Sequence, residues 1–124
     1  MKGIELFKAH DEFRTLDMDE GWTVPEGYPE GIEEKILSGR LDESAKRGSR
    51  TRLLRFLPGA FSTEPFVHEY WEEVLLISGD LIVGSGDEAE SFTPHTYACR
   101  PPGVYHGPFK SDGGCLLVEI HYFD

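Results

Sequence analysis

Residues 66–73, FVHEYWEE, bring together a histidine, three aromatic rings and three glutamates. His68 and Glu72 are separated by three residues in this stretch, and His106 follows a Pro-Gly turn in the later stretch PPGVYHG. Imidazole nitrogens and a carboxylate oxygen suit a borderline divalent ion such as Fe, Mn, Ni, Cu or Zn. A simpler interpretation makes His68 and Glu72 solvated residues at a strand end and packs His106 beside its turn. The spacing alone does not separate the two interpretations.

Short β-type segments must position these residues. Gly, Pro and Asp separate the segments, and closely spaced strands with such punctuation predict an all-β sandwich or barrel. An irregular front precedes them: residues 17–31 mix acidic residues, Gly and Pro and are expected to form a surface loop, and residues 43–48 could form one helical turn. The expected strands are residues 50–57, 72–79, 80–84, 96–100 and 115–123.

The composition describes one globular domain of 124 residues, with 39% hydrophobic and 28% charged residues. Its net charge of −11 argues against nucleic-acid and anionic membrane partners, because both would repel the chain. No apolar run approaches the ~20 residues that span a bilayer, and the start of the chain lacks the apolar stretch of a signal peptide. Cys99 and Cys115 are too few for a disulfide framework. We therefore expect a cytoplasmic protein.

Two segments of the chain resemble the two motifs of the cupin superfamily. Residues 58–81 resemble the first motif, G-x5-H-x-H-x3,4-E-x6-G, and residues 95–110 resemble the second, G-x5-P-x-G-x2-H-x3-N. The matching positions are Gly59, His68, Glu72 and Gly79 in the first motif and Pro101, Gly103 and His106 in the second. The two motifs occur in the expected order.

This resemblance implies the fold and the assembly. The expected architecture is a cupin-type double-stranded β-helix, a small jelly-roll barrel. Residues 51–122 would form the barrel that carries both motifs, and residues 1–50 would add N-terminal strands and loops to the same single domain, 1–124. Small cupins often pair through sheet edges, so the resemblance also implies a homodimer. Apolar residues of the front segment are expected to contribute to its interface, and these are Leu6, Phe7, Trp22 and Tyr28.

Three positions depart from the motifs. Phe66 replaces the first motif histidine, His95 stands at the first glycine of the second motif, and Lys110 stands at its final asparagine. Because His95 follows a proline before a strand, we interpret it as a turn residue with unusual backbone angles and not as a ligand. Phe66 indicates either a cupin that has lost its metal or a site of two histidines and one carboxylate, the set of many non-haem iron oxygenases.

We favour the second interpretation because His68, Glu72 and His106 are all present. The motif allows Glu73 as well as Glu72, but six residues separate Glu72 from the motif glycine and only five separate Glu73 from it. Side chains alternate along a strand, so only one of these glutamates can point inward. Glu72 is the expected ligand.

The last expected strand has two different faces. Leu116, Val118, Ile120 and Tyr122 form one face, which we expect to be the core face. Glu119 and His121 belong to the other face, with Cys115 and Leu117, and are expected at the solvent or at a subunit contact. If that mixed face were inside instead, Glu119 and His121 would be acid–base candidates beside the metal.

Four residues are candidates for a substrate pocket: Phe66, Tyr70, Trp71 and Arg100. The two aromatic residues Tyr70 and Trp71 are expected at the barrel mouth, where they would line a substrate entrance or a dimer interface. Arg100 would pair with a substrate carboxylate or with a nearby glutamate.

The resemblance leaves three classes of function. The first is a metal-dependent enzyme of dioxygenase, isomerase or decarboxylase type that acts on a small organic molecule. The second is a metal-free epimerase or isomerase with a histidine base and a tyrosine acid. The third is a small-molecule binding or sensor domain. We expect the first class, with one divalent transition metal held by His68, Glu72 and His106.

Overall fold

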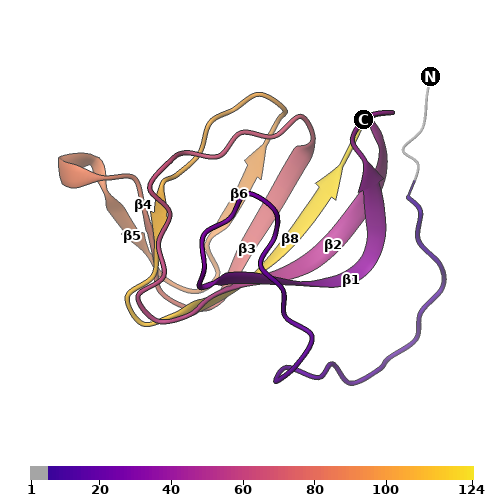
Figure 1. Ribbon diagram of the computed structural model, residues 1–124, viewed down its shortest axis with the longest axis horizontal. Helices are drawn as coiled ribbons and strands as arrows, with labels where there is room; N and C mark the ends of the chain where they lie inside the picture. The colour runs from indigo at the N-terminus through magenta and orange to yellow at the C-terminus, as the bar shows by residue number, and fades with distance from the viewer. Residues whose placement is uncertain (1–5) are drawn as a thin grey trace.

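The computed structural model describes residues 6–124, which form two antiparallel sheets (Figure 1). One sheet has five strands in the order β1-β2-β8-β3-β6, and the other has three in the order β5-β4-β7. Residues 1–5, on which the expectation about the start of the chain partly rested, lie outside the described residues. The strands are β1 (Ile32–Asp42), β2 (Arg47–Phe56), β3 (Trp71–Gly79), β4 (Leu81–Val83), β5 (Glu90–Phe92), β6 (Tyr97–Arg100), β7 (Phe109–Lys110) and β8 (Cys115–Tyr122).

The prediction of an all-β jelly-roll fold is confirmed, and each expected strand corresponds to an observed one. The helical structure within residues 6–124 is one short 3₁₀ turn, Gly86–Glu88. No helix in the described part of the chain is long and apolar enough to cross a membrane. Residues 43–46, in the expected helical turn, form the tight connection between β1 and β2.

Strand β1 was not among the expected strands. It pairs with β2 along its whole length, yet Ile32 is its one buried residue. A strand at a sheet edge that buries so little carries almost no apolar alternation, so its sequence gives a weak signal. Between residues 6 and 31 the structure has no strand beyond an isolated bridge at Thr23, which agrees with the expected loop at residues 17–31.

The core lies between the two sheets. Leu81 of β4 packs with inward residues of β2, β3 and β8, among them Leu54, Leu76 and Leu117. Alternation along β8 sends Cys115, Leu117, Glu119 and His121 inward, where all four are buried. The prediction that Leu116, Val118, Ile120 and Tyr122 form the core face was therefore wrong.

Acidic residues can occupy the inside of the barrel because a buried arginine neutralises their charge. Arg52 on β2 is 2% exposed and pairs with Glu119 at 2.7 Å and with Glu34 at 2.8 Å. It also donates a hydrogen bond of 3.0 Å to the Tyr28 hydroxyl. These partners satisfy the hydrogen-bonding groups of the guanidinium. Burial raises the pKa of Glu119, but the Arg52 charge and hydrogen bonds from His121 and Arg52 lower that pKa well below its usual range. Glu119 is therefore ionised.

We predict that Arg52→Met destabilises the protein by about 3–5 kcal/mol, because it leaves buried carboxylates without their cation. The matched control is Arg55→Met on the same strand, where the half-buried pair with Glu33 contributes only about 0–1 kcal/mol. Urea unfolding of both variants measures the difference. Equal losses in the two variants would contradict the role given to Arg52.

Candidate metal site

The inside of the barrel is divided along its length into an apolar and a polar half. On β2 the inward residues change from Phe56 and Leu54 to Arg52 and Arg50, and on β8 from Cys115 and Leu117 to Glu119 and His121. On β3 they change from Leu76 and Val74 to Glu72. The three strands lie side by side in register, so their polar positions gather at one end of the barrel.

Four inward residues in this half form a row across neighbouring strands. Arg50 of β2 is the register partner of His121, His121 is the partner of Glu72, and Glu72 is the partner of Arg100 on β6. The side chains are joined in the same order. Arg50 Nε lies 3.1 Å from His121 Nδ1, His121 Nε2 lies 2.8 Å from Glu72 Oε2, and Arg100 donates a 2.8 Å hydrogen bond to Glu72 Oε1.

His68 and His106 reach Glu72 from two loops that are tied together. Phe66 and His106 exchange both backbone hydrogen bonds, at 2.7 and 2.9 Å, and the Gly103 amide donates to the His68 carbonyl at 2.9 Å. Gly103 has a φ of 86°, which an L-residue rarely adopts, so this turn of the second motif needs its glycine. The pairing places both imidazoles above the start of β3.

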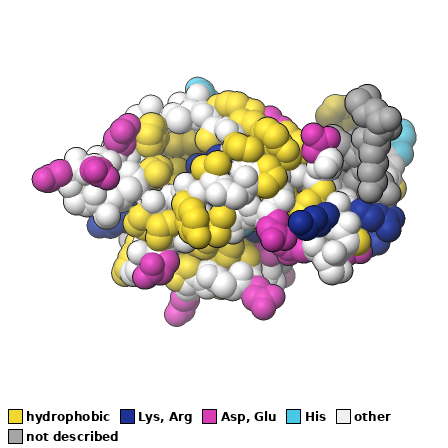
Figure 2. Space-filling view, turned by 90° about the horizontal axis from the view of Figure 1, so that it is seen from above, with side chains coloured by type: hydrophobic (Ala, Val, Ile, Leu, Met, Phe, Trp, Pro, Cys, Tyr) yellow, Lys and Arg dark blue, Asp and Glu magenta, His cyan; other side chains and the backbone are white. Residues whose placement is uncertain are grey.

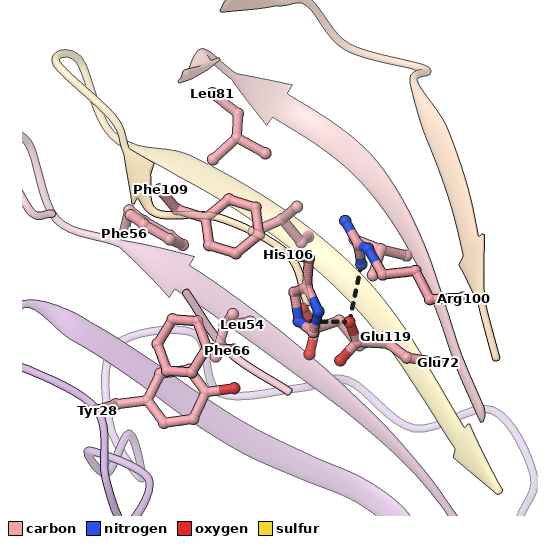
Figure 3. A pocket seen from close by; sticks show the side chains of 12 residues that line it. Tyr28, Leu54, Phe56, Phe66, Glu72, Leu81, Arg100, His106, Phe109 and Glu119 are labelled. Atoms are coloured by element: carbon pink, nitrogen blue, oxygen red, sulfur yellow. Dashed lines mark hydrogen bonds and ion pairs between the residues drawn. The ribbon is translucent and has the colours of Figure 1, made fainter. Parts of the chain in front are cut away.

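The ligand atoms of His68, Glu72 and His106 lie within 4.8 Å of one another. His106 Nε2 is 3.5 Å from Glu72 Oε1, and His68 Nε2 is 3.7 Å from Glu72 Oε2. A dashed line in Figure 3 marks the contact between His106 and Glu72. The second distance is too long for a hydrogen bond. His68 Nε2 is buried and has no hydrogen-bond partner. A buried polar atom without a partner is costly, and here it faces a carboxylate.

His106 presents a lone pair to this space, and His68 presents a buried nitrogen without a partner. The Val104 carbonyl can only accept, so His106 Nδ1 carries the proton of their 3.3 Å contact. Burial lowers the pKa of His106, and it lowers that of His68 to about 4, so both rings are neutral near pH 7. The Nε2 atoms of two neutral imidazoles and the carboxylate of Glu72 then converge on one space. This donor set fits a divalent transition metal.

The neighbouring glutamates point in opposite directions. Glu72 is 3% exposed and faces the imidazoles, whereas Glu73 accepts hydrogen bonds from the Tyr97 and Tyr122 hydroxyls on the outer face of the sheet. Of the two, Glu72 is therefore the one that can share an ion with His68 and His106. His95 has a φ of 75° and lies exposed in a turn, as its position after Pro94 indicated.

The residues expected to line a substrate pocket are separated by the structure. Phe66 and Arg100 line a cavity of about 40 Å³ beside Glu72 and His106 (Figure 3). Tyr70 is buried and stacks on His68 with a ring separation of 4.6 Å, so it supports the imidazole from behind. Trp71 faces the other side of the sheet, where it stacks on Tyr122. The structure does not place Tyr70 or Trp71 among the residues that line this cavity.

A second, larger cavity adjoins the first inside the barrel. Its volume is about 170 Å³, and it shares Val74, Leu81, Arg100 and Leu117 with the lining of the first. Both linings are mainly apolar, and Arg100 is the cation that they have in common. Figure 2, seen from above the view of Figure 1, shows hydrophobic side chains gathered on this face of the molecule. Val67, Val104 and Tyr105, in the loops that carry His68 and His106, are exposed.

Sequence reasoning missed several members of the polar half. Arg50, Arg52 and Tyr28 were not considered as site residues, and Glu119 and His121 were expected at the solvent or at a subunit contact. The available signal was the repeated i, i+2 polar pair, Arg50 and Arg52 on one strand and Glu119 and His121 on another, which places two polar residues on one face. Only the pairing of the strands shows that these faces meet.

No protein-family model matches the sequence, and neither does any curated protein. Solved structures do resemble it. KdgF from a Halomonas species has a TM-score of 0.64 at 20% identity, over 88% of this chain and 93% of that one. An RmlC-like cupin from Shewanella frigidimarina has a TM-score of 0.65 at 16% identity, over 96% of each chain. An acetylacetone dioxygenase from Acinetobacter johnsonii has a TM-score of 0.66 at 16% identity, over 98% of this chain and 80% of that one.

These similarities extend over nearly the whole described chain, and they agree with the two motif segments, which the structure brings together around Glu72. The protein has the fold of the cupin superfamily.

Proposed function

We propose that this protein is a metal-dependent enzyme that acts on a small organic molecule, with one divalent transition metal held by His68, Glu72 and His106. One observation carries the proposal: two neutral imidazoles and a buried carboxylate converge, and His68 Nε2 has no partner. Arg100 bonds to Glu72, yet no described residue bonds to His68 Nε2, which faces the same carboxylate.

The surroundings of the three ligands support a catalytic role over a structural one. A structural site is usually closed by four protein ligands, whereas catalytic sites leave a position for water or substrate. The position of the missing motif histidine is occupied by Phe66, whose ring stacks on Tyr28 at 4.6 Å and lines the cavity. When bound, the metal would act as a Lewis acid that polarises an oxygen atom of the substrate.

The cavity walls indicate what the substrate looks like. Apolar residues of both sheets would hold an apolar body and exclude water, among them Leu54, Phe56 and Phe109. Arg100 lies where the two cavities meet, and its guanidinium has N–H groups beyond the one that bonds to Glu72, so it would orient a carbonyl or carboxylate oxygen. The acetylacetone dioxygenase with this fold makes an oxidative reaction one candidate class.

We predict that His106→Ala abolishes stoichiometric metal binding and leaves the fold intact, because His106 lies in a loop outside the apolar core. His95→Ala is the matched control: this histidine is exposed and outside the site, so metal content should not change. Elemental analysis of untagged proteins purified identically measures the metal, and circular dichroism measures the fold. Equal metal content in the wild type and in His106→Ala would contradict the proposal.

We also propose that the protein forms a homodimer through the outer face of the five-stranded sheet. Apolar side chains are exposed there on neighbouring strands, and these are Leu75, Ile77, Tyr97 and Ile120. The charge in their midst, Glu73, is covered by two tyrosine hydroxyls. An exposed apolar patch that lacks free charge is typical of an interface. In the front segment, Tyr28 instead packs inward on Phe66, and Trp22 stacks against Arg55.

Ile120→Lys should convert this dimer to a monomer, because it places a charge in the centre of the patch, whereas Lys110→Ala, on the other sheet, should leave the dimer intact. Sedimentation equilibrium at micromolar concentration measures both. A monomeric wild-type protein would refute the dimer without affecting the metal site.

A further inference from the structure

We propose that Arg50 and His121 are positioning residues for Glu72, and that His121 does not take the place of the missing motif histidine as a ligand. This inference rests on the proposed metal site. It concerns two residues that lie outside both motif segments, on β2 and β8.

The register of the strands aligns the three side chains. Arg50, His121 and Glu72 are directly opposite one another on β2, β8 and β3, with their side chains on the inner face. His121 is completely buried, and its ring packs on Tyr70 at 4.6 Å. The imidazole therefore has little freedom to move, and its two nitrogens point at fixed partners on either side.

Those partners determine which nitrogen of His121 carries the proton. Arg50 approaches Nδ1 with Nε at 3.1 Å and with a terminal nitrogen at 2.8 Å. A guanidinium has N–H donors and no acceptor, so Nδ1 must offer its lone pair to Arg50. The ring proton is then on Nε2, and Nε2–H donates to Glu72 Oε2 at 2.8 Å.

A protonated Nε2 cannot bind a metal ion. A histidine that ligates through Nε2 keeps its proton on Nδ1 and donates it to a carbonyl, a carboxylate or water. That tautomer would direct an N–H of His121 at the N–H groups of Arg50. The grouping of ligand atoms agrees: those of His121 cluster with the carboxylates of Glu72 and Glu119, whereas those of His68 and His106 form a separate cluster with Glu72.

The same tautomer explains why two buried carboxylates lie close to His121. Its Nε2 is 2.8 Å from Glu72 Oε2 and 3.3 Å from Glu119 Oε1, and Glu119 is in turn neutralised by Arg52. The second cluster of possible ligands is thus a network of hydrogen bonds. Glu72 receives one donor on each oxygen, from Arg100 and from His121, and these fix the plane of the carboxylate in front of His68 and His106.

The test compares two substitutions of His121 by Co²⁺ titration of metal-free protein. His121→Ala removes the donor and should lower Co²⁺ affinity by about 10–100-fold, the usual effect of losing a group that orients a ligand. His121→Gln places an amide N–H near the position of Nε2–H, so it should recover most of the affinity and give the visible absorption of the wild-type Co²⁺ complex.

The outcomes that overturn the inference are specific. If His121→Gln binds as weakly as His121→Ala and its absorption changes, His121 is a ligand. If His121→Ala binds Co²⁺ as tightly as the wild type does, His121 has no positioning role. Failure of the wild type to bind Co²⁺ at all would instead remove the proposed function.

A measurement on metal-free protein tests the tautomer itself. ¹⁵N–¹H spectra of the imidazole of His121 in the metal-free wild type should show a proton on Nε2 and none on Nδ1. In Arg50→Met the fixed preference should be lost, whereas the control Arg55→Met should keep it, because Arg55 pairs with Glu33 on the strand's other face. A proton on Nδ1 of His121 in the wild type would refute the inference, regardless of the result of the Co²⁺ titration.

Discussion

The arrangement of this site depends on one constraint, the burial of the Glu72 carboxylate. A charge that is only 3% exposed must find compensation inside the protein. Arg100 and His121 supply hydrogen bonds, one to each oxygen. His68 and His106 face the same oxygens at 3.7 and 3.5 Å without a bond to them. The two donors orient the carboxylate, and the two imidazoles leave an electron-rich space in front of it. A cation in that space would complete the set, and the proposed function follows from this balance.

The division of the barrel interior makes such a site compatible with a stable fold. Leu54, Leu76 and Leu117 and their neighbours bury apolar surface in one half, and this burial drives folding. The other half contains ionised groups whose desolvation opposes folding, so each of them needs a partner of opposite charge or a strong hydrogen bond. Arg52 provides this for Glu119 as an ion pair. Glu119 in turn lies 3.3 Å from His121 Nε2, so Arg52 also keeps the carboxylate beside His121 ionised. Because the inward positions of β2, β8 and β3 are in register, the polar groups form continuous rows and are not isolated in the apolar half.

Much of this could be predicted from the sequence, and the failures have physical causes. The strands followed from local patterns, as did the turn at His95, where only local backbone conformation matters. The convergence of His68, Glu72 and His106 followed from the resemblance of two segments to the cupin motifs. The inner face of β8 was assigned wrongly because alternation separates two faces without saying which is inside. Leu116 and Ile120 made one face more apolar, but the other was buried because Arg50 and Arg52 lie opposite it. These arginines are 71 and 67 residues away from His121 and Glu119 in the chain, so no local window contains both partners.

Phe66 places an aromatic ring where the cupin motif has a histidine. Its ring stacks on Tyr28 and lies 6.1 Å from the ring of Phe109, so an aromatic wall stands beside the imidazoles of His68 and His106. Phe66 offers no nitrogen to an ion, and the tautomer imposed by Arg50 prevents His121 from replacing the missing histidine. The three proposed ligands therefore lie on the side of Glu72, and the opposite side is apolar and continuous with the two cavities that meet at Arg100. The cavities beside these proposed ligands are mainly apolar and share one cation, Arg100. Selectivity for a molecule with an apolar body and one oxygen donor then follows from the wall, and reactivity follows from the ligands.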